Sequence, residues 1–195
     1  MGEYVITPDQ LGSDSVVYSF GVGKHIAFDL GIIQLFNVTL PAFDPTPVSC
    51  QWIRTQQVPS RFVFHDFGVA GHDGQMHFYP PQRVDSAHYS SIKKSPGASA
   101  VREIEAPVFR LGTIMRRLGH NHIDLLKIDI EGAEYAVLAD MVKSGLDVRQ
   151  VAVEFHHNYP GLSIEHTVTA VEQLRQAGFR LFHIGKRSFE MSFIR

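Results

Sequence analysis

Two acidic residues follow a predicted buried strand in the second half of the chain. The segment Ile123–Ile128 is rich in leucine and β-branched residues, which is typical of a strand buried on both faces. Asp129 and Glu131 come directly after it, followed by Gly132. Alternate residues of a strand point to the same side, so both carboxylates should leave the sheet together at its carboxyl end. Open α/β sheets bind their ligands at that edge. The alternative is a solvated strand end at which Glu131 caps the next helix.

A second group of candidate residues surrounds two glycines near the start of the chain. Gly21 and Gly23 follow a short apolar strand and precede a predicted helix. Glycines in such a turn let the backbone approach a ligand, and the helix N-terminus offers unpaired N–H groups. Asp44 ends the next strand, where a carboxylate can accept both hydroxyls of a ribose. A purely structural turn, with an Asx-turn leading into Pro45, is the alternative.

The sequence also indicates which cofactors the glycine turn does not suit. It contains no G-x-x-x-x-G-K-[ST] segment, so a P-loop nucleotide site is excluded. NAD fits less well, because the third glycine of the dinucleotide fingerprint is missing and His25 and Ile26 follow instead. A cofactor that carries ribose and adenine but no phosphate fits better.

Strands and helices that alternate along the chain are expected to position these residues. We predict strands at 16–20, 38–43, 61–65, 75–79 and 150–155, a further strand that begins at Ile123 and ends at Asp129, and helices at 26–36, 48–56, 111–118, 133–144 and 164–177. The segments 180–184 and 189–194 read as a C-terminal antiparallel hairpin. This order predicts an α/β fold with a mostly parallel sheet covered by helices on both faces. The polar, aperiodic segment 80–97 is expected to be a functional loop, in the role of a lid over a pocket.

Composition limits the classes of protein to which the chain can belong. Its 195 residues, 44% hydrophobic and 19% charged, predict a single domain that spans residues 1–195. A formal charge of -2 leaves no basic surface for nucleic acid. No apolar run approaches the roughly 18 residues of a membrane span, and no secretory signal is visible. With a single cysteine, Cys50, these features favour a cytoplasmic location. They carry no signal for oligomeric state.

Three segments together resemble the FkbM-type methyltransferases. They are residues 17–29, 43–47 and 124–134, of which the last, Leu-Lys-Ile-Asp-Ile-Glu-Gly-Ala-Glu at its core, is the most specific. The resemblance extends over roughly residues 16–184. It implies a Rossmann-like, seven-stranded, mostly parallel sheet and dependence on S-adenosylmethionine. The glycine turn departs from the commoner Asp-Val-Gly-Ala-Asn-x-Gly form, with Ser19 in place of the aspartate, Gly23 in place of the asparagine and His25 in place of the last glycine.

The resemblance implies roles for individual residues. The glycine turn would face the methionine moiety of the cofactor, Asp44 would bind its ribose, and Phe67 with Gly68 would lie beside its adenine. Asp129 would lie near the methyl sulfonium. The complete set of expected cofactor-binding residues is Ser19, Phe20, Gly21, Val22, Gly23, Asp44, Pro45, Phe67, Gly68 and Asp129.

Methyl transfer to a hydroxyl needs a group that takes up the hydroxyl proton. The candidate catalytic residues are Asp129, Glu154 and His156, because the ends of their strands should meet at one edge of the sheet. His157 should point the other way. Related sugar O-methyltransferases use Mg²⁺ at this edge, and Asp129 with Glu154 would suit that ion, although the sequence shows no full ligand set.

The expected function is therefore S-adenosylmethionine-dependent O-methylation of a hydroxyl on a small molecule or glycan. Two alternatives remain open. One is a cofactor-binding module of the same fold that has no turnover, which the altered glycine turn keeps possible. The other is an NAD-type Rossmann enzyme, for which an acidic strand end followed by glycine is not the usual pattern.

Overall fold

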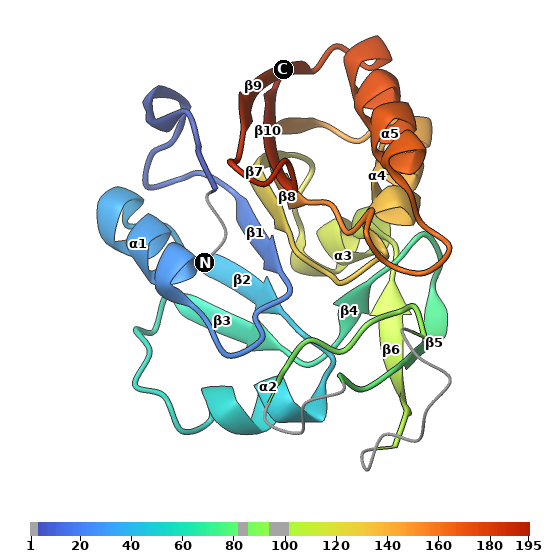
Figure 1. The fold of residues 1–195 in the computed structure, drawn as a ribbon. Helices are drawn as coiled ribbons and strands as arrows, with labels where there is room; N and C mark the ends of the chain where they lie inside the picture. The colour runs from blue at the N-terminus through green and yellow to red at the C-terminus, as the bar shows by residue number, and fades with distance from the viewer. Residues whose placement is uncertain (1–3, 82–85, 94–101) are drawn as a thin grey trace.

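The computed structural model describes residues 4–81, 86–93 and 102–195, which form two sheets with helices around the larger one (Figure 1). The larger sheet has seven strands in the order β3-β2-β1-β7-β8-β10-β9. These strands are β1 (Val17–Phe20), β2 (Leu40–Phe43), β3 (Phe62–His65), β7 (Ile123–Ile128), β8 (Val148–Glu154), β9 (Arg180–Ile184) and β10 (Glu190–Ile194). The first five pair in parallel, whereas β10 runs antiparallel to both β8 and β9. The predicted seven-stranded, mostly parallel α/β sheet with a C-terminal antiparallel hairpin is confirmed.

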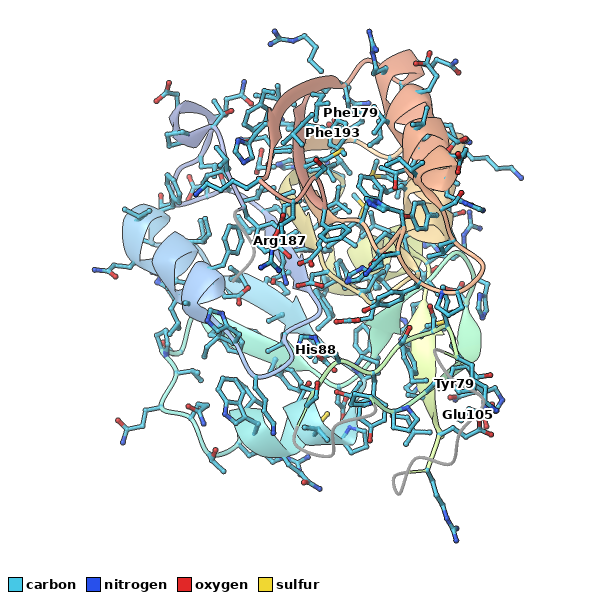
Figure 2. The ribbon with its side chains drawn as sticks, in the orientation of Figure 1. Tyr79, His88, Glu105, Phe179, Arg187 and Phe193 are labelled. Carbon is cyan, nitrogen blue, oxygen red and sulfur yellow. The ribbon has the colours of Figure 1, made fainter. Side chains whose placement is uncertain are left out.

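Helices cover both faces of this sheet. They are α1 (Ala27–Phe36), α2 (Pro47–Ile53), α3 (Leu111–Leu118), α4 (Glu134–Lys143) and α5 (Ile164–Gln176), with a short 3-10 helix η1 at Pro8–Gln10. All five helices begin and end within a few residues of the predicted bounds. Successive side chains of β7 enter different cores: Leu126 packs in the cluster that includes α3, α4 and α5, and Leu125 in the cluster that includes α1. Phe179 and Phe193, labelled in Figure 2, belong to the first cluster, beside the C-terminal strands. Burial on both faces explains why β7 reads as a continuous apolar run.

A smaller sheet of three strands lies next to α2 and α3 in Figure 1. It contains β4 (Gly68–Val69), β5 (Gly74–Phe78) and β6 (Ile104–Phe109) in the order β4-β6-β5. The predicted strand at 75–79 is confirmed as β5, but it belongs to this sheet and not to the large one. The sequence analysis missed β6, whose Pro107 argues against a central strand even though Ala106 and Val108 show the buried alternation of one.

The segment before β1 is fastened to the large sheet. The backbone N–H of Thr7 donates to Oε1 of Gln150 at 2.8 Å, and Nε2 of Gln150 donates to the Thr7 carbonyl at 3.0 Å. Ile6 and Leu11 pack against the cluster on the α1 face. This double hydrogen bond from β8 fixes the direction of the chain that leads back to Tyr4.

The predicted loop at 80–97 lies partly outside the described residues, since 82–85 and 94–97 are not described. In its described part, Tyr79 and Ser90 exchange backbone hydrogen bonds of 2.8 and 3.0 Å. The function of this loop as a lid stays a prediction. None of the helices in the described ranges has the length and apolar character needed to cross a membrane.

Candidate functional site

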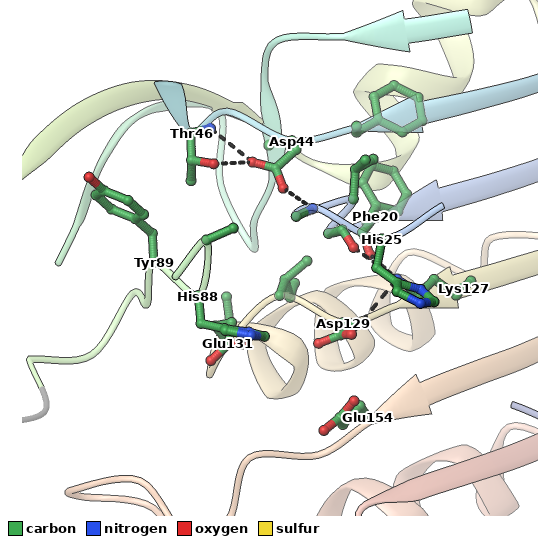
Figure 3. A pocket seen from close by; sticks show the side chains of 18 of the residues that line it. Phe20, His25, Asp44, Thr46, His88, Tyr89, Lys127, Asp129, Glu131 and Glu154 are labelled. Carbon is green, nitrogen blue, oxygen red and sulfur yellow. Dashed lines mark hydrogen bonds and ion pairs between the residues drawn. The ribbon is translucent and has the colours of Figure 1, made fainter. Parts of the chain in front are cut away.

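A cavity of about 1070 Å³ opens at the carboxyl edge of the large sheet (Figure 3). Its wall includes residues at or just after the ends of four neighbouring parallel strands, namely Phe20, Phe43, Asp129 and Glu154. From β1 the chain continues to β2 and β3 on one side, and later to β7 and β8 on the other. The strand order therefore reverses between β1 and β7, which is where open α/β sheets place their ligand sites.

The glycine turn brings the end of β1 into close contact with the end of β7. Gly21 has φ +83°, and a Cβ built on it would lie 1.6 Å from the carbonyl oxygen of Asp129. No residue other than glycine fits this position without moving the backbone of one strand. Nζ of the buried Lys127 donates to the carbonyls of Phe20 and Gly21 at 3.3 and 2.9 Å. These two hydrogen bonds from Lys127 hold the glycine turn against the end of β7.

One end of the cavity, the Asp44 end, is formed by Asp44, Gly23 and Thr46. Oδ2 of Asp44 accepts the Gly23 N–H at 2.8 Å, and Oδ1 accepts the N–H and hydroxyl of Thr46 at 2.9 and 2.7 Å (Figure 3). Thr46 is also the N-cap of α2. These donors hold the buried carboxylate in one orientation, and Oδ2, which accepts a single hydrogen bond, keeps a lone pair for a ligand hydroxyl.

Eight of the ten residues expected to bind a cofactor line this cavity. They are Phe20, Gly21, Val22, Gly23, Asp44, Pro45, Gly68 and Asp129. Ser19 and Phe67 are not among the lining residues. Ser19 is fully buried within β1, and the ring of Phe67 packs against Phe43 and Phe109 at 5.4 and 5.2 Å between ring centroids. The aromatic ring expected beside a ligand is therefore partly buried against the core cluster.

The smaller sheet supplies an apolar wall that the sequence analysis missed. Val69, Met76 and Phe78 line the cavity together with the predicted Pro45 and Gly68. A β-strand of only two residues has no local pattern in the sequence. The alternation of apolar residues along β6, which lies between β4 and β5, was the available signal.

At the opposite side, the Glu154 end is formed by Glu154, Asp129 and Tyr4. The hydroxyl of Tyr4 is 2.9 Å from Oδ2 of Asp129 and 3.2 Å from Oε2 of Glu154. Its ring packs edge-on against Phe28 and lies 5.4 Å from Nζ of Lys127. The sequence analysis brought Asp129 and Glu154 together correctly but missed Tyr4, which precedes every recognisable pattern.

Charge crowding perturbs proton affinities at the Glu154 end. Burial and the nearby negative charges of Asp129 and Glu190 raise the pKa of Glu154 to about 7, although the charge of His156 opposes this shift. Burial and the carboxylates of Asp129 and Glu154 raise the pKa of Tyr4, which keeps the phenol protonated at neutral pH. Glu154 is therefore the carboxylate best placed to take up a proton near neutral pH.

Asp129 and Glu131 do not leave the sheet by strand alternation, so that expectation is wrong. The strand ends at Ile128, and Glu131 has φ +56°, which turns the chain out of the extended conformation. Oε1 of Glu131 lies 2.6 Å from Nδ1 of His88, and its Oε2 accepts the hydroxyl of Tyr159. Glu131 nevertheless lines the cavity, because the tight turn points its side chain toward the same edge (Figure 3).

His156 lies at the centre of the acidic groups. Its Nδ1 is 2.6 Å from Oε1 of Glu134, and its Nε2 is 3.8 to 4.0 Å from Asp129, Glu131 and Glu154. Burial lowers its pKa, but the hydrogen bond and charge of Glu134, with Glu131 and Asp129, outweigh this and raise the pKa to about 9. The imidazole is therefore a cation at neutral pH, which balances part of the negative charge.

The acidic groups also bear on the metal question. Asp129, Glu131 and His156 each place one ligand atom within 4.8 Å of the others. This set differs from the pair of Asp129 and Glu154 considered from the sequence. Protonation of His156 opposes metal binding there, because a metal requires the neutral imidazole.

A second cavity of about 550 Å³ shares part of its wall with the first. Glu131, Glu154 and His88 line both cavities. The second is also lined by His156 and by the rings of Tyr159, Phe155 and Phe189. A ligand in this space would meet aromatic faces and carboxylates, and would lie next to Glu154.

Comparisons with known proteins identify a family and several relatives of this chain. Residues 22–181 match the model of the methyltransferase FkbM domain. A probable methyltransferase-like protein 24 of Homo sapiens is 31% identical over 96 residues, which cover 44% of this chain and 26% of the human protein. The 31-O-demethyl-FK506 methyltransferase FkbM of Streptomyces tacrolimicus is 29% identical over 171 residues, covering 70% and 64% of the two chains. The match thus spans less than two thirds of either relative.

Among solved structures, the Aeropyrum pernix fibrillarin with natively bound S-adenosyl-L-methionine aligns at a TM-score of 0.46 and 11% identity. That alignment covers 97% of this chain and 69% of the fibrillarin chain. The family match, by contrast, covers most of the sequence, including Gly23, Asp44 and the acidic end of β7. On this ground the chain belongs to the methyltransferase FkbM domain family.

Proposed function

We propose that this domain transfers the methyl group of S-adenosylmethionine to a hydroxyl of a small molecule or glycan. Membership of the family supports the methyl donor. The observation that carries the choice of a hydroxyl acceptor is the position of Tyr4. Its hydroxyl lies within hydrogen-bonding distance of both Asp129 and Glu154, so the space between these carboxylates accommodates a hydroxyl donor.

The chain's own residues fit the donor. Asp44 would accept the ribose hydroxyls, since its carboxylate is already oriented by Gly23 and Thr46. The apolar wall from the smaller sheet suits the adenine, and the glycine turn admits the methionine moiety close to the backbone. When bound, S-adenosylmethionine supplies an electrophilic methyl group. The volume of the cavity, about 1070 Å³, is sufficient for this molecule and part of an acceptor.

The acidic residues then handle the acceptor proton. Glu154, with a pKa of about 7, would take the proton from the acceptor hydroxyl as the oxygen attacks. Asp129 would share that proton in a bifurcated hydrogen bond before the transfer, as it shares the hydroxyl proton of Tyr4 here. Cationic His156 would stabilise the two carboxylates while both are charged. The aromatic rings of the second cavity would hold the rest of the acceptor.

Calorimetric titration with S-adenosylhomocysteine, NAD and ADP tests the proposal. We expect S-adenosylhomocysteine alone to bind, and ligand at a hundred times its dissociation constant to stabilise the fold by about 2.7 kcal/mol. Binding of NAD in its place would support the NAD-type alternative. Binding of S-adenosylhomocysteine without methyl transfer to any compound in a panel of sugars and polyols would favour the module without turnover. Repeating the panel with EDTA and with Mg²⁺ measures whether a divalent ion contributes.

A further inference from the structure

Asp29 is a buried acid to which the proposed mechanism assigns no role. It lies in the first turn of α1 and is 2% exposed, yet it is among the residues that line the large cavity. Its Oδ1 has no hydrogen-bond partner among the residues that the structure describes. A buried carboxylate oxygen without a partner is unfavourable, so this position calls for an explanation from a ligand.

The surroundings of Asp29 satisfy only part of its carboxylate. Burial raises its pKa, and the charge of Lys127, hydrogen bonds from the Ser19 side chain and the backbone, and the charge of His25 oppose that shift. Lys127, however, directs its own hydrogen bonds to the carbonyls of Phe20 and Gly21. Within the described part of the chain, the protein therefore leaves one oxygen of a buried carboxylate, Oδ1, without a donor beside the glycine turn.

The ligand group that would best satisfy this carboxylate oxygen is a small cationic donor. An ammonium group has three N–H donors, and a charge-assisted hydrogen bond to a carboxylate is roughly twice as strong as a neutral one. The methionine moiety of S-adenosylmethionine carries such a group at the end opposite to its ribose. The glycine turn, between Asp29 and the Asp44 end, is the part of the wall that this moiety would pass.

We propose that Asp29 binds the α-ammonium group of the methionine moiety. The commoner form of the glycine turn has an aspartate at the end of β1, where this chain has Ser19, and Asp29 would supply the missing acid. This inference rests on the proposed function, because it assumes the same ligand in the same cavity. It assigns the amino-acid end of the cofactor to a helix residue, where the glycine turn itself offers no acid.

Three ligands separate this interaction from the rest of the site. They are S-adenosylhomocysteine, its analogue that lacks the α-amino group, and 5′-methylthioadenosine, which lacks the whole amino-acid part. We expect the wild-type domain to bind S-adenosylhomocysteine about tenfold or more tightly than the deamino analogue in calorimetric titrations. Asp29→Asn should bind the two with similar affinity and should retain the wild-type affinity for 5′-methylthioadenosine.

Glu165→Gln is the matched control, because Glu165 is likewise an acid in the first turn of a helix but is exposed and does not line either cavity. It should keep the wild-type preference for the amino group. The melting temperature of unliganded Asp29→Asn should be unchanged or higher, because the substitution removes an unsatisfied buried acid.

Two results would overturn the inference. One is an Asp29→Asn variant that retains the preference for the amino group. The other is an equal loss of affinity for all three ligands with a lower melting temperature, which would show that Asp29 is structural. If wild type binds 5′-methylthioadenosine but does not discriminate the amino group, only this inference fails. If wild type binds none of the three ligands, the proposed function fails with it.

Discussion

Asp44 and Glu154 line the same cavity at the same edge of the sheet, but their surroundings differ. Asp44 accepts three hydrogen bonds from Gly23 and Thr46, which fix the carboxylate before any ligand arrives. Glu154 faces Asp129 and Glu190, and this crowding with burial raises its pKa to about 7. A carboxylate that hydrogen bonds hold in one orientation is suited to binding, whereas a carboxyl group with a pKa near neutral pH is suited to proton transfer. The difference assigns cofactor binding to the Asp44 end and chemistry to the Glu154 end.

Of the substitutions considered, replacing Glu154 should change the rate of methyl transfer most. We expect Glu154→Gln to lower the rate of methyl transfer about 10²- to 10⁴-fold, because the amide cannot take up the acceptor proton. Its affinity for S-adenosylhomocysteine should not change. The rate would be measured with the most active compound in the sugar and polyol panel. Nearly full turnover in the variant would remove Glu154 from the mechanism.

The two glycines of the turn that joins both ends provide a matched pair. In Gly21→Ala the new Cβ would collide with the Asp129 carbonyl, so the free energy of unfolding should fall by about 3 kcal/mol or more. In Gly23→Ala the nearest atom is 3.9 Å from the Cβ, and only the strain of φ +55° remains, about 1 kcal/mol. Urea denaturation of both variants measures the difference. Equal losses would contradict the close contact between the β1 and β7 ends.

The pH dependence of kcat/KM reports on the Glu154 end alone. Glu154 must be ionised to accept a proton, so the rate should rise about tenfold per pH unit until it levels near pH 7. His156 loses its charge above a pKa of about 9, so a decrease should follow there. The affinity for S-adenosylhomocysteine should stay flat between about pH 6 and pH 8. A rate that stays flat across pH 7 would exclude Glu154 as the base.

Tyr4→Phe should have the smallest effect. The variant loses a hydrogen bond that lowers the pKa of Glu154, so the rise of the pH–rate profile should move to higher pH. The free energy of unfolding should decrease by about 1 kcal/mol. Phe28→Leu, which removes the ring contact of Tyr4 but leaves its hydroxyl, should leave the profile in place. A shift of equal size in both variants would show that packing of the N-terminal segment, and not the hydroxyl, sets the profile.

Much of the arrangement could be predicted because it depends on local patterns. The apolar run of β7 and the glycines at Gly21 and Gly23 have short-range physical causes, and they placed Asp129 and Asp44 at the correct edge. Phe67 does not line the cavity, because its ring packs against Phe43 and Phe109, which are distant in the sequence. Tyr4 could not be predicted as a site residue, since the segment that carries it is held by hydrogen bonds between Thr7 and Gln150, far away in the sequence.

The outcome at β7 shows the same limit at a single residue. Strand alternation is a reliable guide only while the strand continues, and the left-handed conformation of Glu131 ends it. The side chain still reaches the cavity, but through a turn stabilised by Glu134, which accepts the Gly132 N–H at 3.0 Å. Long-range packing therefore decides the details of a site whose location local patterns predict.

The most direct test of the division between the two ends is the affinity for S-adenosylhomocysteine of wild type, Asp44→Ala and Glu154→Gln, measured by titration calorimetry. We expect wild type and Glu154→Gln to bind equally, and Asp44→Ala to lose about a hundredfold while its unliganded fold still melts cooperatively. Wild-type affinity in Asp44→Ala, or an equal loss in both variants, would contradict the separation of binding from chemistry.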